Sequence, residues 1–431
     1  MLRQRLIPFS AKCEGSSSKL IEGLENIKNN HEVDVVDVVV TGIGLHCSLG
    51  SLLTSWQRLL AGESGLRSHQ PFPELSPRLL GLIDKEPVQL TSLTQQVVAS
   101  ALQDAGLVTP LPDCGVVIGS SRSCQGLWEQ LALKMSQKGE GEIGLEYWLD
   151  TLLHQASVTA ARQVGATGPV LAPMAACSTG IWAIAQGYEL IQTGQCQRVI
   201  VGAIEAPITR LTLTAFSQMG VLAKTGYYPF DKHREGLLPG EGGAVLVLES
   251  AELALRRDAP IYGQVLGFSM TCDAEHATSP SQKRYSATRA VKQCLERSHL
   301  SPSDIDYIHA HGSGTPINDK NEAELIEYLF PKGVPVSGSK GATGHTLGAC
   351  AAIGAAFCLM SLKEQQLPPC VGLKEPEFDL DWVTSARQGL IRRVLCFSFG
   401  FGGQNAVVAF GHPSLNRLEN RLQVGRLKVE G

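Results

Sequence analysis

The fold is decided by two stretches, "GPVLAPMAACSTGIWAIAQGYELI" (168–191) and "VPVSGSKGATGHTLGACAAIGAAFCLM" (334–360). Both follow one plan: a Pro-Val strand, a turn of small residues, and a helix made largely of Ala, Ile and Gly. Another strand follows each, "RVIVGAIEA" in the first half and "RRVLCFSFGFGG" in the second. Although the two stretches share little identity, this repetition predicts a duplicated protein with two α/β halves.

Apolar strands alternate with helical segments around these stretches. The first strand is predicted from Val35 to Val40, ending at the turn Thr41-Gly42, and a helix is predicted over 51–62 with Gly62 as its C-cap. Because the strands are apolar on both faces, we expect sheets covered by helices on each side. Further strands are predicted at 114–121, 168–177, 197–206, 242–250, 261–270, 305–312, 334–340 and 392–400.

The charged stretch "ESAELALRRDAP" (249–260) is where the two halves are expected to join. The predicted organisation is an N-terminal extension at 1–34, a first half at 35–255, a second half at 256–412 and a C-terminal tail at 413–431.

The composition excludes several classes of protein. Of 431 residues, 43% are hydrophobic and 18% charged, so the chain can bury enough apolar surface to fold. With 37 basic and 41 acidic residues, a net charge of −4 provides no positive field for nucleic acid. No apolar stretch approaches the roughly 20 residues that span a bilayer. The 12 cysteines include no C-x-x-C pair, which argues against a zinc ribbon and favours a reducing compartment.

The segment 1–34 has basic residues and a serine cluster but no continuous apolar region for secretion. Two interpretations remain, an organelle transit peptide and a solvated extension, and Glu14, Glu22 and Glu25 favour the second. We therefore expect a cytoplasmic protein, or a plastid or mitochondrial one if 1–34 is a transit peptide.

Cys177, in "AACSTG", follows a predicted strand and begins a helix. The unpaired amides and positive dipole end of a helix stabilise a thiolate, so this position predicts a lowered thiol pKa and a nucleophilic sulfur. Backbone amides around such a turn can also bind an oxyanion. The alternative is that Cys177 is a packed small hydrophobe, as most cysteines are.

His311 lies in "HAHGSGTPINDKNE" (309–322). On a strand His309 and His311 would share a face and could ligate a metal, but no third ligand is evident nearby, so zinc is set aside. Asp319 and Glu322 begin the next helix, where a carboxylate can orient imidazoles or cap the first turn.

Lys340 and His345 lie in "GSKGATGHTLGA" (338–349), a turn that again leads into a small-residue helix. A solvated lysine and a satisfied core histidine are the alternative. The glycine-rich "CFSFGFGGQNAVVAF" (396–410) predicts a loop that permits close approach, with Phe399 and Phe401 as core or gate residues.

Five motifs occur in one order: "AACSTG", "YPFDKHREGLLPGEGGAVLVLE", "HAHGSGTPINDKNEAE", "GSKGATGHTLGA" and "FSFGFGGQNA". On these motifs, from about residue 36 to 411, the chain resembles the β-ketoacyl-[acyl-carrier-protein] synthases of the elongating type. The resemblance implies a thiolase-like α/β fold, with two duplicated halves in five layers, α/β/α/β/α, and usually a homodimer. It implies decarboxylating condensation of acyl and malonyl groups delivered by acyl-carrier protein, without a metal or redox cofactor.

The resemblance also implies roles for single residues. Cys177 would take the acyl chain as a thioester, with its own amide and that of Phe401 as the oxyanion hole, and Phe401 would also gate the site. His311 and His345 would stabilise the enolate formed as malonyl-carrier protein loses carbon dioxide, and Lys340 would set their field. A pair of histidines implies elongation of carrier-bound chains rather than initiation from acyl-CoA.

Other matching positions support that site. Asp319 and Glu322 would lie behind the histidines, and Thr278, Ser313 and Thr315 match residues that line the pantetheine channel.

Some positions depart from the family pattern. A glycine-rich loop that helps to shape the acyl pocket is replaced by "GSSRSCQG" (119–126), which leaves the acyl chain length open. Gly354 stands where fatty-acid members have a glutamate, which is closer to polyketide-type synthases. Tyr228 replaces a common arginine, and Arg210 and Lys224 are candidates for carrier-protein contacts.

Two other functions compete with this one. A non-catalytic chain-length-factor-like partner of a heterodimer would share the fold, but such partners lack the nucleophilic cysteine. A thiolase acting on CoA substrates is disfavoured by "HGSGT" and by the combination of Lys340 with His345.

Overall fold

The apolar strands pair into one large sheet in the computed structural model, which describes residues 36–138 and 148–413. The predicted extension at 1–34 and nearly all of the predicted tail lie outside the described residues. The first half contributes β1 (Val38–Cys47), β5 (Cys114–Gly119), β6 (Val170–Leu171), β7 (Arg198–Glu205) and β8 (Gly242–Ser250). The second contributes β9 (Gly263–Cys272), β10 (Tyr307–His309), β11 (Val336–Ser337), β14 (Arg393–Gly400) and β15 (Gln404–Gly411).

The same topology occurs twice. The strand order is β11-β10-β14-β15-β9-β1-β8-β7-β5-β6. Outward from the centre, the first half runs β1-β8-β7-β5-β6 and the second half runs β9-β15-β14-β10-β11. If the five strands of each half are counted along the chain, both halves have the order first, fifth, fourth, second, third. β5 is parallel to β6 and β7, as β10 is to β11 and β14, and the remaining pairs are antiparallel in both halves. In the centre β1 meets β9, from Val38 opposite Val265 to Val40 opposite Gly263. A duplicated chain accounts for this match, while the boundary at 255 stays a prediction.

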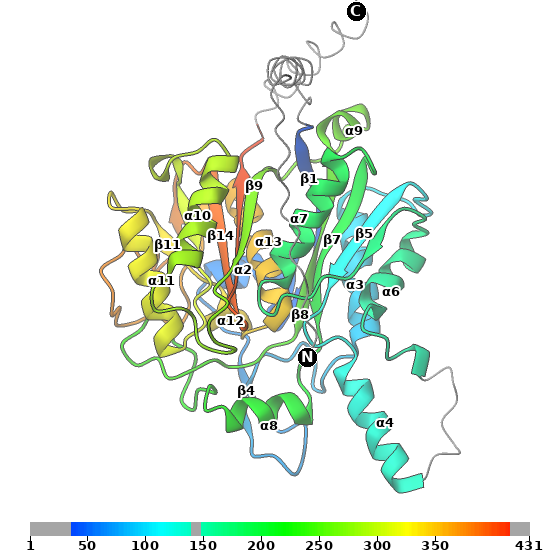
Figure 1. The fold of residues 1–431 in the computed structure, drawn as a ribbon, viewed down its shortest axis with the longest axis vertical. Coiled ribbons are helices and arrows are strands. Elements are labelled where there is room, and N and C mark those ends of the chain that lie inside the picture. The colour runs from blue at the N-terminus through cyan, green and yellow to red at the C-terminus, as the bar shows by residue number, and fades with distance from the viewer. Residues whose placement is uncertain (1–35, 139–147, 414–431) are drawn as a thin grey trace, which may run out of the picture. The chain divides into compact units, whose positions relative to one another are not determined.

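Helices cover the strands in layers (Figure 1). In the middle, α7 (Thr179–Gln192) packs against α13 (Cys350–Glu364), between the strands of the two halves. The outer faces are covered by α3 (Leu90–Asp104) and α6 (Gln155–Val164) in the first half, and by α10 (Tyr285–Arg297) and α11 (Pro316–Leu329) in the second. These are the five layers, α/β/α/β/α, that the resemblance implied.

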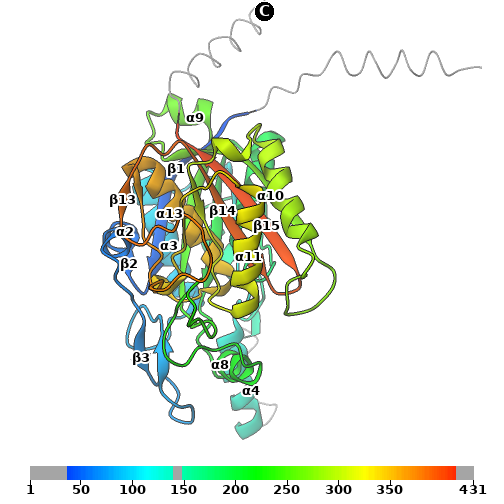
Figure 2. The same ribbon diagram turned by 90° about the vertical axis from the view of Figure 1, so that its left-hand side faces the viewer.

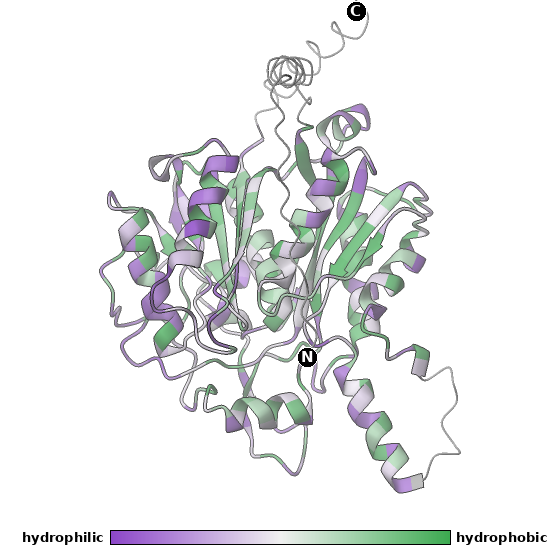
Figure 3. Cartoon of the chain, viewed as in Figure 1, coloured by the Kyte–Doolittle hydropathy of each residue, from purple (hydrophilic) through white to green (hydrophobic). Residues whose placement is uncertain are grey.

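The central helix α13 has no polar face. Residues 350–362 are all buried, because protein covers every side of the helix. Figure 3 shows the same distribution, with apolar residues in the middle layers and hydrophilic ones on the outer helices. The segment Leu347–Glu364 is long and apolar enough to cross a membrane, but 89% of it is buried inside the fold. Burial identifies it as a core helix.

The first strand does not end where the sequence suggested. β1 passes through Thr41-Gly42 with a bulge and continues to Cys47. The glycines of this strand allow α3 to approach it closely. At Gly44, for example, a Cβ would lie 2.0 Å from the Val97 carbonyl oxygen. Glycine here permits helix-to-strand contact rather than a turn.

Three other strands are shorter than predicted. The strand expected over 168–177 is only the two-residue β6, the one expected over 305–312 is only the three-residue β10, and the one expected over 334–340 is only the two-residue β11. The residues that follow β6 and β10 form turns instead, and these turns carry Cys177 and His311.

Most of the remaining elements are shorter, although α4 has 14 residues. In Figures 1 and 2, α4, α8 and the β3–β4 hairpin lie at one end of the layers. The bounds are β2 (Gly50–Ser51), α2 (Leu52–Leu60), β3 (Arg67–His69), β4 (Arg78–Leu80), α4 (Gln125–Lys138), α8 (Arg210–Gln218), α9 (Ala251–Arg256), η1 (Pro302–Asp304), α12 (Lys340–Thr343), η2 (Leu347–Ala349), β12 (Gln366–Leu367) and β13 (Arg387–Gln388).

Candidate active site

Cys177 stands on a tight turn immediately before α7. The preceding residue, Ala176, has φ +47°, a left-handed conformation that costs energy in a residue with a side chain. Thr179 stabilises the turn, because its hydroxyl accepts from the Ala175 amide at 2.9 Å and donates to the Ala176 carbonyl at 2.7 Å. The turn presents the Cys177 side chain to a cavity while its backbone stays fixed.

Residues of the second half hold the same turn. The Ser398 hydroxyl on β14 donates to the Cys177 carbonyl at 2.9 Å. In return, the Ser178 hydroxyl donates to the carbonyls of Ser398 at 3.0 Å and Gln404 at 2.7 Å. The position of Cys177 therefore depends on strands more than 200 residues further along the chain.

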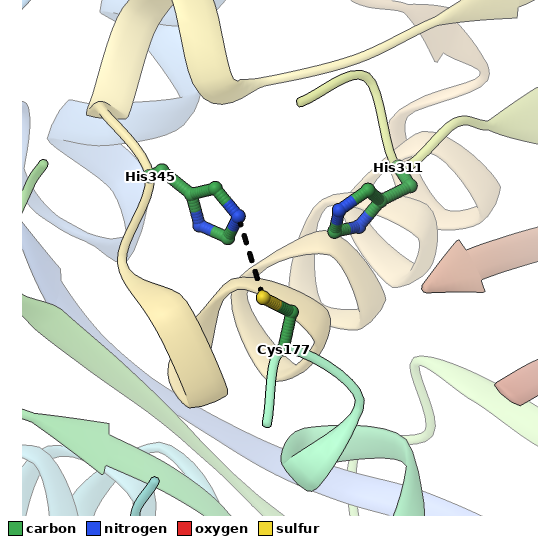
Figure 4. Close-up of side chains that lie close together, drawn as sticks. All are labelled: Cys177, His311 and His345. Carbon is green, nitrogen blue, oxygen red and sulfur yellow. Dashed lines mark hydrogen bonds between the residues drawn. The ribbon is translucent and has the colours of Figure 1, made fainter. Parts of the chain in front are cut away.

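Two histidines from the second half meet Cys177 (Figure 4). The Nε2 atom of His345 lies 3.5 Å from the Cys177 sulfur, and the rings of His311 and His345 have centroids 5.5 Å apart. The sulfur and one nitrogen from each ring lie within 4.8 Å of one another, and this donor set could ligate a metal ion. The three side chains thus form one group, although the sequence placed them in three separate motifs.

The hydrogen bonds of His345 determine which ring nitrogen carries its proton. Nδ1 accepts from the Leu347 amide at 3.1 Å, so in the neutral ring the proton is on Nε2, which faces Cys177. Burial, and then the charge of Lys340, hold the pKa of His345 well below its usual value of 6.5. At neutral pH the ring is a hydrogen-bond donor to the cavity.

Lys340 determines which ring nitrogen of His311 carries the proton. Its ammonium is buried and donates to the His311 carbonyl and, at 3.4 Å, to His311 Nδ1. With Nδ1 accepting, the proton of the neutral ring is on Nε2. Burial, followed by the charges of Lys340 and His345, holds the pKa of His311 well below 6.5.

The predicted lowering of the Cys177 pKa is wrong for this free thiol. Burial raises its pKa from 9.0 to about 12, and the nearby Cys350 adds to the rise. Lys340 and a hydrogen bond from the Phe401 amide act in the opposite direction but are outweighed. Desolvation of the charged form is the largest of these influences on the pKa, because only 9% of the residue is exposed.

The two carboxylates bind backbone amides rather than imidazoles. Glu322 accepts from the amides of His311 at 2.5 Å and Gly312 at 2.8 Å. Asp319 accepts from the amides of Gly314 at 3.1 Å and Phe230 at 2.8 Å. Of the two roles considered for them, these hydrogen bonds show neither contact with an imidazole nor a cap on the first turn of α11; the carboxylates hold the loop that carries His311.

His309 does not share a face with His311, because β10 ends at His309. Its Nε2 lies 3.1 Å from the Ser339 hydroxyl, and its Nδ1 lies 4.0 Å from the Cys396 sulfur. Of the two histidines considered as metal ligands, His309 is therefore packed in the core and His311 lines the cavity.

A cavity of about 260 Å³ contains the three catalytic candidates. Of the predicted site residues, Phe401, Thr278, Ser313 and Thr315 also line it, whereas Lys340, Asp319 and Glu322 lie behind its wall. The other lining residues are Ser121, Arg122, Met174, Ala176, Phe216, Leu237, Asp273, Ser279, Pro280, Asn318, Leu347, Phe399, Gly400, Gly403 and Asn405.

Sequence reasoning missed Glu205, which is fully buried at the end of β7. It accepts from the Ser120 hydroxyl at 3.1 Å and from the amides of Ser121, Arg122 and Gly348. It therefore joins the loop at 119–126 to the turn that carries His345. The sequence did contain an indication of this role, because a carboxylate at the end of a continuous apolar strand is expected to be buried and to need hydrogen-bond partners.

Comparison with known proteins adds a second line of evidence. Residues 83–254 match the family model described as "Beta-ketoacyl synthase, N-terminal domain", and residues 262–374 match "Beta-ketoacyl synthase, C-terminal domain". The 3-oxoacyl-[acyl-carrier-protein] synthase 2 of Synechocystis sp. is 34% identical over 404 residues, covering 86% of this chain and 97% of that protein. The Staphylococcus aureus (strain MRSA252) protein of the same name is 32% identical over 405 residues, covering 87% and 98%.

Solved structures are similar over the same region. One is a chain of the complex between a type II PKS acyl-carrier protein and its ketosynthase bound to the hexaketide, with TM-score 0.84, 26% identity and coverage of 88% of this chain and 100% of that one. A chain of the ishigamide ketosynthase/chain length factor has TM-score 0.83, 28% identity and the same coverage. A beta-ketoacyl synthase from Burkholderia phymatum has TM-score 0.81 and 25% identity, again over 88% and 100%.

Proposed function

The chain belongs to the β-ketoacyl synthase family, and on this basis we propose that Cys177, His311 and His345 carry out decarboxylating condensation on acyl-carrier-protein substrates. The protein is an acyltransferase of the 3-oxoacyl-[acyl-carrier-protein] synthase class. The reaction joins an acyl-enzyme thioester to malonyl-acyl-carrier protein and yields 3-oxoacyl-acyl-carrier protein, in fatty-acid or related polyketide synthesis.

The first half-reaction moves the acyl group to Cys177. The sulfur attacks the thioester carbonyl, the amides of Cys177 and Phe401 bind the oxyanion, and the bond to the pantetheine sulfur breaks. The proton lost by Cys177 ends on the departing pantetheine thiol. The support for this role of Phe401 is its amide, which hydrogen-bonds toward the Cys177 sulfur.

The second half-reaction uses both histidines as donors. Their Nε2–H groups bind the carbonyl oxygen of the malonyl thioester and stabilise the enolate as carbon dioxide leaves. The enolate carbon attacks the acyl-Cys177 carbonyl, the carbon–sulfur bond breaks, and the departing Cys177 thiolate takes up a proton from solvent. Burial, and then the charge of Lys340, lower the pKa of both rings and keep them neutral, and Lys340 holds the Nδ1 of His311 as an acceptor.

The observation that carries the proposal is the contact between Cys177 and His345 in the wall of one cavity. Thr278, Ser313 and Thr315, on the same wall, are proposed to bind pantetheine. The chain-length-factor alternative is disfavoured because a non-catalytic partner needs neither the nucleophile nor the two oriented donors.

Acyl-carrier protein is the proposed partner, and the protein is proposed to act as a homodimer. The support for a dimer is β6, which forms one edge of the sheet and exposes Val170 and Leu171. Unpaired edge strands of this kind pair readily with a second chain. Met174, which is 53% exposed and also lines the cavity, places the active site next to this edge. We propose a cytoplasmic location, or an organelle if 1–34 is a transit peptide.

Incubation with labelled acyl-carrier protein tests the proposal. Mass spectrometry should find the acyl group on Cys177, and adding malonyl-carrier protein should release 3-oxoacyl-carrier protein. Labelling that persists unchanged in Cys177→Ala would contradict the mechanism. Condensation that begins only after another synthase-like subunit is added would favour the chain-length-factor alternative, and carrier-independent activity on acetoacetyl-CoA would favour a thiolase.

A further inference from the structure

Arg122 brings a positive charge into the wall of the active-site cavity. It lies on the loop at 119–126, between β5 and α4. Its backbone amide donates to Glu205 Oε2 at 3.3 Å, and this hydrogen bond fixes the loop to a buried carboxylate. Its guanidinium carbon lies 5.5 Å from the ring centroid of Phe216, another residue of the cavity wall. The side chain is therefore partly buried and lies beside another residue of the cavity wall.

Apart from the Phe216 ring, the guanidinium has no hydrogen-bond or ion-pair partner among the described residues. Its Nε atom is buried and makes no hydrogen bond, and no carboxylate of residues 36–138 or 148–413 lies within ion-pair distance of it. The acidic residue that shares the cavity wall is Asp273, whose oxygens already accept from the Asn405 side chain at 2.8 Å and the Ser281 amide at 3.0 Å. Among the arginine nitrogens that are buried without an acceptor, this one belongs to a residue of the active-site cavity wall, so a bound acyl chain can supply the missing acceptor.

This charge affects two kinds of acyl chain in opposite ways. A saturated alkyl chain that fills the cavity removes water from the guanidinium and offers no hydrogen bond in return, which is unfavourable. A chain that carries a carboxylate replaces the lost water with charge-assisted hydrogen bonds, for which the planar guanidinium is well suited. The apolar side chains of Phe216 and Leu237 still accommodate the methylene groups between the thioester and the carboxylate.

We propose that this enzyme preferentially elongates acyl chains that carry a carboxylate, and that Arg122 is the specificity-determining residue that binds it. The inference rests on the proposed function, because it assumes that the acyl chain enters the cavity from Cys177. It names a substrate class, half-thioesters of dicarboxylic acids, that neither the family models nor the relatives specify.

A carboxylate at Arg122 has two sources, the far end of the acyl chain and the malonyl group. The acyl chain is the source we assign, because Arg122 stands beside apolar residues of the first half and contacts neither His311 nor His345, where the malonyl thioester is proposed to bind. The two half-reactions separate these sources experimentally.

The test is self-acylation of Cys177, measured by mass spectrometry without malonyl-carrier protein. The substrates are carrier proteins with alkyl acyl groups and with ω-carboxyacyl groups of matched length, in a series of increasing length. We expect the wild type to favour the ω-carboxyacyl member by about tenfold or more at the length that reaches Arg122, since hydrogen bonds to charged groups have that magnitude. Arg122→Leu should abolish or reverse the preference, and Arg122→Lys should retain part of it.

Two controls keep the outcome interpretable. Arg289→Leu makes the same change at an exposed position of α10 outside the cavity, and it should leave the preference unchanged. Acylation by the shortest alkyl groups, which do not reach Arg122, should be similar in the wild type and Arg122→Leu and reports that the variant is folded.

Several results would overturn the inference. The inference fails, and the proposed function stands, if the wild type accepts alkyl chains as well as or better than ω-carboxyacyl chains and Arg122→Leu does not change this ratio. An effect of Arg122→Leu on malonyl-carrier-protein decarboxylation alone would assign Arg122 to the malonyl carboxylate instead. If neither substrate series acylates Cys177, the proposed function itself fails.

Discussion

The Nε2 atom of His345 lies 3.5 Å from the Cys177 sulfur, although 168 residues separate them in the chain. The amide of Leu347 donates a hydrogen bond to Nδ1 of the same ring at 3.1 Å. His345 is therefore a donor toward the cavity and not a base that removes the thiol proton.

Replacing His345 tests this assignment. We expect His345→Ala to lower kcat for condensation by about 10²- to 10³-fold, as the loss of one oxyanion donor does. His345→Asn should retain more activity, because its amide nitrogen can still donate. Malonyl decarboxylation, measured as released carbon dioxide, should fall further than self-acylation of Cys177. A larger loss in self-acylation would instead indicate that His345 acts as a base.

The raised pKa of Cys177 predicts its reactivity. With a pKa of about 12, only a small thiolate fraction exists near neutral pH, so alkylation by iodoacetamide should accelerate about tenfold per pH unit between pH 7 and 9. Peptide mass spectrometry follows Cys177, and the exposed Cys272 serves as an internal control for the reagent. A rate that levels off below pH 8 would indicate a preformed thiolate.

Lys340 should determine the acidic limit of activity. Burial is the main reason, and Lys340 the next, that the pKa values of His311 and His345 lie well below 6.5. Removing the charge in Lys340→Met should raise both pKa values, so the acidic limb of the pH–rate profile for malonyl decarboxylation should move to higher pH. Lys340→Arg, which keeps the charge, should show a smaller movement. An unchanged inflection in Lys340→Met would mean that Lys340 has only a structural role.

Glu241 should make stability depend on pH. Burial raises its pKa from 4.5 to about 7, although it accepts from the amides of Ile83 and Val88. Because the folded-state pKa is the higher one, the stability it contributes is full below pH 4.5 and is lost as pH rises through about 7. Relative to Glu241→Gln, the wild type should lose about 3 kcal/mol of unfolding free energy across this range, measured with urea.

A second glutamate provides the control of opposite sign. Hydrogen bonds from Thr225 lower the pKa of the exposed Glu235, so its contribution is present above pH 4.5 and is lost as pH falls. Glu235→Gln should therefore show the reverse trend. If the difference between the wild type and Glu241→Gln does not change with pH, the carboxyl is not titrating in the folded protein over this range.

The contact between β1 and α3 should tolerate no side chain at Gly44. An added Cβ would lie 2.0 Å from the Val97 carbonyl oxygen and 2.6 Å from the Ala101 nitrogen. Gly44→Ala should therefore reduce the free energy of unfolding by at least about 2 kcal/mol. Gly389→Ala, where nothing lies within 4 Å, should remain within about 0.5 kcal/mol of the wild type. Equal stability of both variants in a thermal melt would contradict this packing.

The duplicated α/β plan and the position of Cys177 before a helix could be predicted from the sequence, because strand and helix periodicity and small-residue turns are local patterns. His311, Lys340 and His345 were identified as site residues together with Cys177 by the resemblance of five ordered motifs to a known family. Even the errors in strand length occurred beside the functional turns, where backbone irregularity replaces periodic structure.

How those residues behave depends on contacts made in three dimensions. The resting Cys177 thiol has a raised pKa because elements distant in the sequence bury it. Asp319 and Glu322 hold amides, and the Arg122 Nε atom has no acceptor, because packing determines which polar groups find partners. Desolvation and hydrogen bonding depend on everything that surrounds a group in space, and most of those neighbours are remote in sequence.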